Sequence, residues 1–496
     1  MKIKYITTAI DYPNSLPHIG HAYEKILADF YNRYYKQKGE NTFYQTGTDE
    51  HGIKIYNTAK NNKVTPKKLV DSNSKKFKEF YKKLNIEYDN FVRTSDKKNH
   101  WPGVQNLWNE LIKSGDLFLK KYNAKYCIGC ESFKTDSELI DGFCEYHPNK
   151  KLENVEEENY FFKLSKYQKK LIDIISKEKY KVQPKSVKNE LISFLKEDLQ
   201  DISFSRVKSK LPWGIPVPND KNQVMYVWAD ALSNYITGIG YGSNKKNYEK
   251  LWPADAHIIG KDISRFHAIY WPAMLLSAKL KLPKKLLAHG FVNDKDGKKM
   301  SKSLGNVVDP IEQVNKYGAS SLRYYLLRSP SNQDVSYDES DLITKHNTEL
   351  SNNLGNLVSR SLNLIEKSGG KIPSGKLDKK IESNYKKLLK TIDKNIEDFE
   401  FHMAVSNIWN FISSINEYID TKKPWTLSGK EKENILYNLA ESLKLICALI
   451  YPIIPSKSLE ISKKLGLKNV PKFKSDKIKI GQKINKGEYL FTKYEN

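Results

Sequence analysis

The first fifty residues alternate between strand-like and helix-like patterns, and this order constrains the fold more than any other feature of the sequence. Residues 3–9 predict a buried strand, residues 19–38 predict a helix, and residues 41–46 predict a second strand. A strand, loop, helix and strand of these lengths indicate a parallel α/β sheet. Because ligands of such sheets lie beyond the carboxyl ends of the strands, residues 9–21 and 46–52 are expected at one rim.

The composition fits a multidomain globular chain and excludes several other classes. The chain has 496 residues, of which 39% are hydrophobic and 28% are charged, so it can bury a core. At roughly 150 residues per domain, the length suggests about three structural units. A transmembrane helix would need about 18 consecutive apolar residues, and the sequence has no such run. The N-terminus has neither an apolar signal region nor an Arg/Ser-rich presequence, so no targeting peptide is expected.

The net charge points to a polyanionic partner without locating its site. Lys and Arg exceed Asp and Glu by 83 to 58, which gives a formal charge of +25 and favours nucleic acid or nucleotide phosphates. Coding bias in an AT-rich genome would also raise the lysine content. Only the tail, residues 461–496, is locally very basic, with ten basic and three acidic residues.

Three of the four cysteines form a metal-binding pattern with one histidine. Cys127-x2-Cys130 and Cys144-x2-His147 are two short pairs of soft ligands, as expected for a tetrahedral structural zinc site with no open position. The alternative is a metal-free loop with reduced cysteines. Cys447 lies in an apolar run and is expected to be a small core residue. So few cysteines exclude a disulfide scaffold.

Two further motifs have the chemistry of a nucleotide site. His18-Ile19-Gly20-His21 follows a strand and starts a helix, where backbone amides and imidazoles can meet phosphate oxygens. Far downstream, Lys299 and Lys302 bracket a short polar loop after an Asp-Gly turn, and they could neutralise charge on a polyphosphate. Alone, each motif would also fit surface histidines or a solvated lysine-rich loop.

Together these motifs resemble the HIGH and KMSKS signatures of class I aminoacyl-tRNA synthetases, the second letter for letter. Over essentially the whole chain, the sequence is most similar to the methionyl-tRNA synthetase family. The segments that carry this finer resemblance are 9–12, 17–23, 47–52, 226–231, 259–267, 356–360 and 424–425. Asp11 departs from the Tyr or Pro more often expected there, which affects one loop of the amino-acid pocket.

The resemblance implies a Rossmann-type parallel-sheet catalytic domain, split by a zinc-binding connective insertion and followed by an α-helical bundle that binds the anticodon. The expected parts are the first catalytic half (1–113), the insertion (114–222), the second half with the KMSKS region (223–336), the anticodon-binding helices (337–460) and a basic tail that packs back on the body (461–496). Strand-like runs at 223–228 and 257–260 and a helical pattern over 337–451 fit this division.

The resemblance also implies a reaction. Methionine and ATP form methionyl-adenylate and diphosphate, and the methionyl group then passes to the 3′ end of tRNA(Met), including the initiator, for protein synthesis. The implied catalytic residues are His18, His21, Lys299 and Lys302. The implied ATP-binding residues are His18, Gly20, His21, Gly260, Asp262, Lys299, Met300, Ser301, Lys302 and Ser303. Mg²⁺ is expected to accompany ATP.

The methionine side chain is uncharged and polarisable, so its pocket should be apolar, with aromatic contact to sulfur. Asp49 is expected to pair with the α-ammonium, although it could also cap a helix after Thr48. The implied methionine-binding residues are Ala9, Ile10, Tyr12, Asp49, Trp228, Leu232, Tyr235, Ile263 and His267. Without the resemblance, Trp228 and Tyr235 would be assigned to the core.

Anticodon recognition is expected from stacking and base-edge hydrogen bonds, the usual way in which single-stranded RNA loops are read. The resemblance assigns stacking to Trp425 and hydrogen bonding to Asn356 and Arg360. Trp425 could instead cap a helix against the core, and Asn356 and Arg360 could form a solvated patch on one helix face.

Rival functions are a synthetase for isoleucine, leucine, valine or cysteine, a non-catalytic RNA-binding paralogue, and a simple nucleotidyltransferase. The aliphatic enzymes need an editing domain too large for residues 114–222, and a cysteine enzyme should place its zinc in the amino-acid pocket. Intact motifs argue against a decayed paralogue, and a nucleotidyltransferase would not need the long helical region. A cytoplasmic monomer without membrane contact is expected.

Overall fold

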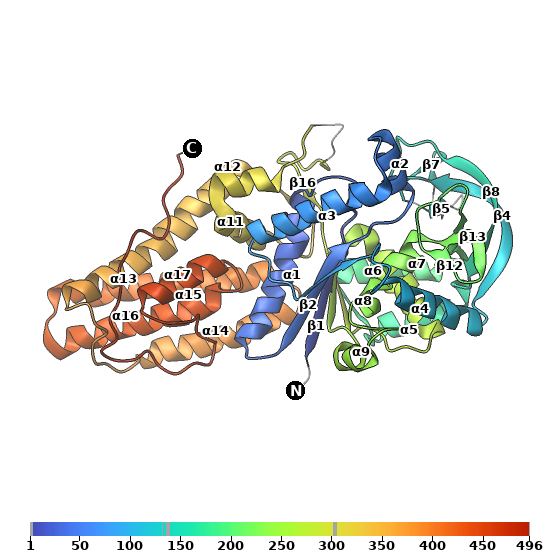
Figure 1. The fold of residues 1–496 in the computed structure, drawn as a ribbon. Helices are drawn as coiled ribbons and strands as arrows, with labels where there is room; N and C mark the ends of the chain where they lie inside the picture. The colour runs from blue at the N-terminus through green and yellow to red at the C-terminus, as the bar shows by residue number, and fades with distance from the viewer. Residues whose placement is uncertain (1–2, 131, 135–138, 301–304, 496) are drawn as a thin grey trace. The chain divides into compact units, whose positions relative to one another are not determined.

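The computed structural model describes residues 3–130, 132–134, 139–300 and 305–495. The chain forms two compact units, each built from segments that are far apart in the sequence (Figure 1). The first unit contains Met1–Pro17, Phe43–Glu79 and Tyr88–Ala288, and the second contains His18–Thr42, Phe80–Glu87 and His289–Asn496.

A six-stranded sheet forms the centre of the first unit. Its strand order is β3-β2-β1-β14-β15-β9. The bounds are Asn90–Arg93 for β3, Thr42–Thr48 for β2, Lys4–Thr8 for β1, Ala256–Gly260 for β14, Lys285–His289 for β15 and Lys181–Gln183 for β9. The pairs β1–β14, β2–β3 and β15–β9 are parallel, as the N-terminal pattern predicts.

The sequence patterns locate most of these elements to within two residues. The helix expected at 19–38 is α1 (Ile19–Gln37), and the strand expected at 257–260 is β14. The strand expected at 223–228 ends earlier, because β13 (Asp220–Met225) is followed by the short helix α7 (Val227–Ala231). Buried apolar runs in a strand and in a short helix look alike in sequence, so periodicity does not mark this change.

The segment expected as an insertion contains two antiparallel sheets and a small hairpin. The four-stranded sheet β10-β8-β4-β5 comprises Ile202–Ser203, Glu153–Phe162, Leu117–Cys127 and Ser132–Lys134. The three-stranded sheet β11-β13-β12 adds Ser205–Val207 and Pro216–Val217, and β6 (Leu139–Ile140) pairs with β7 (Phe143–Cys144). Strand β9 of the same segment joins the edge of the six-stranded sheet, so this segment also extends the central sheet.

Helices complete the first unit around one large hydrophobic core. They are α2 (Ile53–Asn61), α3 (Pro66–Lys83), α4 (Trp101–Lys113), α5 (Gln168–Ser176), α6 (Lys185–Lys196), α8 (Asn234–Thr237), α9 (Lys245–Leu251) and α10 (Trp271–Ser277). A π-helix, Phe266–Tyr270, precedes α10. The core combines strand residues such as Tyr5 with helix residues such as Trp108 and Trp271.

The second unit is mainly helical. It contains α1, α11 (Pro310–Arg328), α12 (Glu339–Lys345), a π-helix (His346–Gly355), α13 (Asn356–Lys367), α14 (Lys379–Glu397), α15 (Phe401–Lys422), α16 (Gly429–Ile450) and α17 (Pro455–Lys464). Short strands β16 (Val292–Asn293) and β17 (Val335–Ser336) pair in parallel. Helix α15 packs on both α14 and α16, which confirms the expected helical bundle (Figure 1).

A buried ion pair holds the centre of the second unit. The Arg323 guanidinium on α11 is fully buried and lies 2.7 Å from Asp29 on α1. It also donates to the carbonyls of Pro452 and Ile453, so one side chain connects α1, α11 and the turn before α17. Arg33 binds the same Asp29 carboxylate at 2.8 Å. A buried carboxylate needs such complete pairing, because isolated charges are strongly destabilised away from water.

The basic tail packs back on the helices of its own unit. Ile478 donates its backbone N–H to the buried Glu441 carboxylate at 2.7 Å, and Ile484 donates to the carbonyl of Gly370. Phe473, Ile478, Ile484 and Leu490 are buried. Among the described residues, no helix combines the length and the apolar character that crossing a membrane requires.

Candidate functional site

The carboxyl ends of β1 and β2 are joined by backbone hydrogen bonds beyond the strands themselves. Asp11 donates its N–H to the carbonyl of Gly47 at 2.9 Å, and Asp49 donates to the carbonyl of Asp11 at 2.8 Å. Gly47 is required here, since a Cβ atom would lie 2.1 Å from the carbonyl oxygen of Val92. The buried Asp49 therefore stands at the rim that the strand order predicts for ligands.

The two residues after Asp49 are also fixed through their backbones. Glu50 donates its N–H to Thr94 Oγ1 at 2.8 Å, and its carbonyl accepts from Trp213 Nε1 at 2.6 Å. The carbonyl of His51 accepts from the Tyr12 hydroxyl at 2.6 Å. The segment 49–51 is thus held by three parts of the first unit, namely residues 11–12, Thr94 and Trp213.

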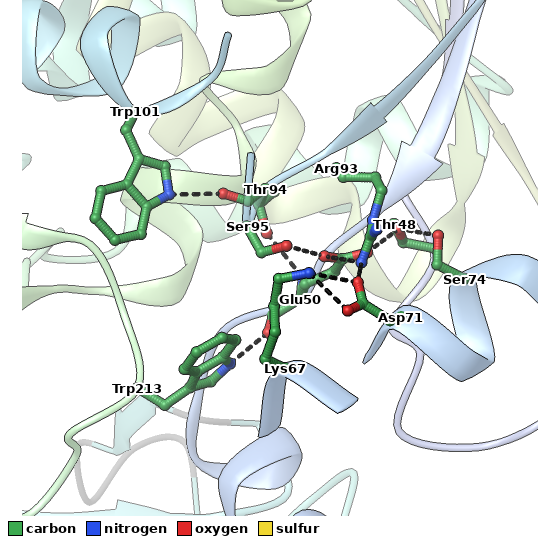
Figure 2. A network of polar contacts seen from close by, with 10 residues as sticks. All are labelled: Thr48, Glu50, Lys67, Asp71, Ser74, Arg93, Thr94, Ser95, Trp101 and Trp213. Atoms are coloured by element: carbon green, nitrogen blue, oxygen red, sulfur yellow. Dashed lines mark hydrogen bonds and ion pairs between the residues drawn. The ribbon is translucent and has the colours of Figure 1, made fainter. Parts of the chain in front are cut away.

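The Glu50 side chain is the centre of a polar network (Figure 2). Its carboxylate is fully buried and accepts from Thr48 Oγ1 at 2.7 Å, from Arg93 Nε at 2.7 Å and Nη2 at 2.9 Å, and from the Ser95 hydroxyl. Burial alone would lower the pKa of Arg93, but its hydrogen bonds and charge interaction with Glu50 raise the pKa above the usual value. Arg93 therefore keeps its positive charge next to the Glu50 carboxylate across the ordinary pH range.

Asp230 connects the same segment to α7. Its carboxylate, which is 1% exposed, accepts from His51 Nδ1 and from His100 Nε2, both at 2.6 Å. Burial would raise the pKa of Asp230, but the two histidines lower it, so the group stays ionised. His100 Nδ1 lies 2.7 Å from the Thr237 hydroxyl, which completes a buried chain of four side chains.

The predicted methionine-binding residues all belong to the first unit. Leu232, Tyr235 and His267 are buried, at 1% exposure each. The partly buried members that pack against the core are Ala9, Tyr12, Trp228 and Ile263. Ile10, which follows Ala9, is also partly buried. The set therefore combines core residues with accessible ones, as a pocket wall requires.

Aromatic side chains order the accessible part of this set. Trp228 stacks on Phe266 with ring centroids 3.8 Å apart and an angle of 6° between the rings, and His267 meets Trp228 edge-on. His267 Nδ1 lies 2.9 Å from the carbonyl of Ile263, so it donates there and leaves Nε2 to accept from the Tyr235 hydroxyl at 2.6 Å. This arrangement fixes the ring orientation of His267 next to the predicted pocket.

The histidines of the first nucleotide motif start α1, in the second unit. His18 caps the helix by accepting from the N–H of Gly20, and the N–H of His18 donates to His21 Nδ1 at 3.1 Å. Burial and the nearby positive charge of Lys25 lower the pKa of His21 to about 3. His21 is therefore neutral at physiological pH, with its other ring nitrogen protonated.

A buried cluster of charged and polar side chains lies on the first turns of this helix and around them. Glu24 accepts from the fully buried Lys25 at 2.6 Å and lies 3.4 Å from Nε2 of His289. Burial would raise the pKa of Glu24, but Lys25 and His289 lower it to about 2. The cluster connects the helix that starts at the first nucleotide motif with His289 of the same unit.

The second nucleotide motif is described only in part. Lys299 pairs with Asn293 through a backbone bridge, and its ammonium lies 4.9 Å from the centre of the Phe291 ring. Met300 is partly buried. The predicted residues Ser301, Lys302 and Ser303 lie outside the described residues.

The turn before this motif is fixed by Asp294. Its carboxylate accepts from the N–H groups of Asp296 and Lys298 and from the Asn306 amide at 2.7 Å. Gly297 has φ of 76°, a conformation that glycine adopts without strain. The expected Asp-Gly turn is confirmed.

The remaining predicted ATP-binding residues belong to the first unit. Gly260 is the buried last residue of β14, and Asp262 is exposed in the single 3₁₀ turn that follows it, Lys261–Ile263. Both stand at the carboxyl end of a central strand, where the fold presents ligand-binding groups.

The four predicted metal ligands converge. The Sγ atoms of Cys127, Cys130 and Cys144 and a ring nitrogen of His147 all lie within 4.8 Å of one another. His147 Nδ1 is 3.3–3.9 Å from the three sulfur atoms. Tetrahedral zinc with bonds of about 2.1 and 2.3 Å separates its ligands by roughly 3.5–3.8 Å, so the donor set fits the ion. Gly129 leaves room for the imidazole, since a Cβ there would lie 2.3 Å from the ring.

The predicted anticodon-binding residues lie on the helical bundle. Asn356 is exposed at the start of α13, and Arg360 of the same helix forms a 2.5 Å ion pair with Asp420 of α15. Trp425 lies in a 3₁₀ turn, Pro424–Thr426, and is 54% exposed. The alternative that Trp425 caps a helix against the core is therefore wrong, because a core tryptophan would be buried.

Comparisons with known proteins agree on one family. The family described as "tRNA synthetases class I (M)" matches residues 4–155 and 137–362, and "Anticodon-binding domain of tRNA ligase" matches residues 378–491. The methionine–tRNA ligase of Caldanaerobacter subterraneus is 41% identical over 100% of this chain and 79% of its own length, and that of Brucella suis is 42% identical over 91% and 89%.

A solved structure of Mycobacterium tuberculosis methionyl-tRNA synthetase, in complex with methionyl-adenylate, is 36% identical and superposes with a TM-score of 0.93, covering 99% of this chain and 100% of that one. The chain belongs to the methionyl-tRNA synthetase family. The class I catalytic fold and the helical anticodon-binding region expected from the sequence are therefore confirmed.

Sequence reasoning missed several residues that shape this family member's site. Arg93, Ser95, His100 and Trp213 were not singled out, because their partners lie far away in the chain. One signal was available for Arg93 and Ser95. Arg93 is the last residue of β3 and Ser95 follows it, and side chains at the carboxyl end of a strand next to β2 are expected at the same rim.

The low pKa of His21 predicts that its ring stays neutral over about pH 5 to 8, where a free histidine titrates. In NMR spectra of the protein labelled on histidine rings, the His21 signals should stay constant over this range, and His21→Gln should assign them by their loss. As the pH falls from 6.5 to about 3, His21 becomes protonated in the unfolded chain but stays neutral in the folded chain. The free energy of unfolding therefore decreases over this range. A midpoint near 6.5 for His21 would contradict this account.

Proposed function

We propose that this chain activates L-methionine with ATP and transfers the methionyl group to the 3′ end of tRNA(Met), including the initiator tRNA. The observation that carries the proposal is the likeness to a solved relative that holds methionyl-adenylate, at a TM-score of 0.93 over 99% of the chain. The residues predicted to bind methionine also include a buried carboxylate, that of Asp49, and an aromatic ring, that of Trp228, which stacks on Phe266.

The first step requires little covalent chemistry from the protein. The methionine carboxylate attacks the α-phosphorus of ATP in line, the bond to the bridging oxygen breaks, and diphosphate leaves with its electron pair. The protein orients the two substrates and stabilises the charge that develops on diphosphate. In the second step a hydroxyl of the terminal tRNA ribose attacks the methionyl carbonyl and AMP leaves.

The two nucleotide motifs supply the charge stabilisation. His18 and His21 contact the triphosphate, and the neutral His21 donates a hydrogen bond from Nε2 because its Nδ1 accepts from the backbone. Lys299 and Lys302 neutralise the leaving diphosphate. Asp262 accepts from the ribose hydroxyls, and Gly20, Gly260, Met300, Ser301 and Ser303 complete the nucleotide contacts. Mg²⁺ would accompany ATP and screen the phosphate charges.

Methionine recognition combines one charge with an apolar wall. Asp49 binds the α-ammonium, and its buried position in a low-dielectric site strengthens that pairing. Trp228, stacked on Phe266, offers an aromatic face to the thioether, for which sulfur–aromatic contact is favourable. The Tyr235–His267 pair supplies the polar group near sulfur.

Zinc is proposed as the structural ion of the Cys127, Cys130, Cys144 and His147 set. Four protein ligands leave no open coordination position, so the ion would hold the knuckle together without acting on substrate. The small hairpin β6–β7 contributes Cys144, and β4 ends at Cys127, so the metal would join two sheets of the same segment.

The further assignments concern the RNA and the whole molecule. Trp425 stacks on an anticodon base, and Asn356 and Arg360 hydrogen-bond to it. We also propose the functional division into catalytic halves 1–113 and 223–336, a connective segment 114–222, an anticodon-binding region 337–460 and a tail 461–496. We further propose that the protein is a monomer and acts in the cytoplasm.

The direct test is amino-acid-dependent ATP–diphosphate exchange with each of the twenty amino acids and no tRNA. Methionine should support exchange, and Asp49→Asn should raise the methionine KM by about tenfold or more, because a charged hydrogen bond to the ammonium is lost. Exchange with a different amino acid would overturn the methionine pocket, and no exchange with any would overturn the synthetase function.

The anticodon assignment predicts that Trp425→Ala lowers the charging of tRNA(Met) by roughly 5- to 100-fold, the range expected for one stacked base. ATP–diphosphate exchange should be unchanged. The control is Tyr489→Ala, which removes another exposed aromatic side chain of the same unit and should leave both reactions intact. An equal fall of charging and exchange after Trp425→Ala would show a structural role instead.

The metal assignment predicts one zinc ion per chain, measured by atomic emission on the purified protein. Cys144→Ser should lose the ion, since a neutral hydroxyl replaces a thiolate ligand. Cys447→Ser is the matched control, because Cys447 is a buried cysteine of α16 that is not part of the set, and this variant should keep its full zinc content. Full zinc content in Cys144→Ser would reject the proposed site.

A further inference from the structure

We propose that Glu50 is a positioning residue for the amino acid's ammonium group, acting through its neighbour Asp49. This inference rests on the proposed function, since it gives a role in methionine binding to a residue that does not itself touch methionine. Glu50 lies at the centre of a hydrogen-bond network (Figure 2), and it directly follows Asp49 in the chain.

All the polar atoms of Glu50 are engaged within the first unit. One carboxylate oxygen accepts from Thr48 Oγ1 and Arg93 Nε at 2.7 Å, and the other accepts from Arg93 Nη2 and Ser95. The N–H donates to Thr94, and the carbonyl accepts from Trp213. These six hydrogen bonds restrain both the side chain and the backbone of residue 50.

Asp49 is therefore held from both sides. Its own N–H donates to the carbonyl of Asp11 at 2.8 Å, and the next N–H, that of Glu50, donates to Thr94 Oγ1 at 2.8 Å. With both flanking peptide groups fixed, the Asp49 carboxylate can turn only about its side-chain bonds. A binding group held in this way needs less ordering when the ligand arrives.

The charge of Arg93 reaches from this buried centre to the surface. Its guanidinium binds Glu50 through two nitrogens and also binds Asp71 of α3 at 2.6 Å, and Asp71 in turn accepts from Lys67. The side chains of Glu50, Arg93 and Asp71 are 0%, 27% and 43% exposed. Arg93 thus connects the buried Glu50 carboxylate to the more exposed Asp71 carboxylate, and its planar fork suits two carboxylates better than a lysine would.

Two small substitutions should weaken the hydrogen bonds that hold residues 49 and 50. Glu50→Gln keeps the size of the side chain but places an amide where only acceptors are tolerated, facing the guanidinium. Ser95→Ala removes one donor and leaves the charges in place, so it keeps the inference testable if Glu50→Gln folds poorly. Both variants should raise the KM for methionine with little change in the KM for ATP, the first by about tenfold and the second by about threefold.

The decisive comparison uses two inhibitors of exchange that differ only in the ammonium group. L-methioninol carries it, and 4-(methylthio)butan-1-ol lacks it. Glu50→Gln should weaken inhibition by L-methioninol about tenfold and leave inhibition by the alcohol within about twofold of the unchanged protein. The double variant Asp49→Asn/Glu50→Gln should bind L-methioninol no more weakly than Asp49→Asn alone, since both act on one contact.

A matched control separates positioning from general stability. Asp116 is another buried carboxylate of the first unit, 1% exposed, which accepts from Lys166 and Ser277 at 2.7 Å and from Tyr167. Asp116→Asn should lower the melting temperature, as Glu50→Gln does, without changing the ratio of the two inhibition constants.

The outcomes are distinct. Equal weakening of both inhibitors by Glu50→Gln, or no weakening of either, in a protein whose unchanged form exchanges diphosphate with methionine, would overturn the positioning role alone. If the unchanged protein shows no methionine-dependent exchange, the proposed function fails, and the inference falls with it.

Discussion

The site depends on one requirement, that the charge of Glu50 be matched while it is buried. Removing a carboxylate from water costs several kcal/mol unless hydrogen bonds and an opposite charge replace the lost hydration. The parallel register that pairs Thr48 with Arg93 brings two of the donors next to each other at the end of β2 and β3. A slip of one residue would turn these side chains to the opposite face of the sheet. The strand register and the buried charge therefore enforce each other.

The segment that carries Glu50 is also connected to the helix of Trp228, through Asp230. His51, directly after Glu50, binds Asp230 of α7, and α7 also carries Trp228. The carboxylate proposed for the ammonium and the ring proposed for the thioether are thus built on segments that share buried hydrogen bonds. A substrate with a charge at one end and a polarisable group at the other is well served by such rigidity, because distance between the two contacts becomes part of the selectivity.

How much the sequence revealed follows from how local each signal is. The β1-α1-β2 order and the convergence of the four candidate metal ligands were predictable, since strand and helix periodicity and a Cys-x2-Cys spacing are local patterns. The end of β13 was not, because a buried strand and a short buried helix have the same composition.

Contacts between distant segments were equally hidden. Nothing near Arg360 indicates that Asp420 lies 2.5 Å away, and nothing near Glu50 indicates Trp213. Exposure of Trp425 could be decided only from the fold. The motif residues indicated the chemistry of the site, whereas the residues that hold them in place could be identified only from the structure.

The discontinuity of the second unit has a consequence for biogenesis. Helix α1 leaves the ribosome early, with Asp29 destined for the interior, yet its partner Arg323 is synthesised about 300 residues later, which takes roughly 15 to 60 seconds at ordinary translation rates. During this interval α1 can contact early segments of its unit, such as Asn85 and Glu87, but Phe30 still lacks Phe401, against which its ring packs. Slow translation of the intervening segment would therefore delay the completion of this buried ion pair and of the packing around it.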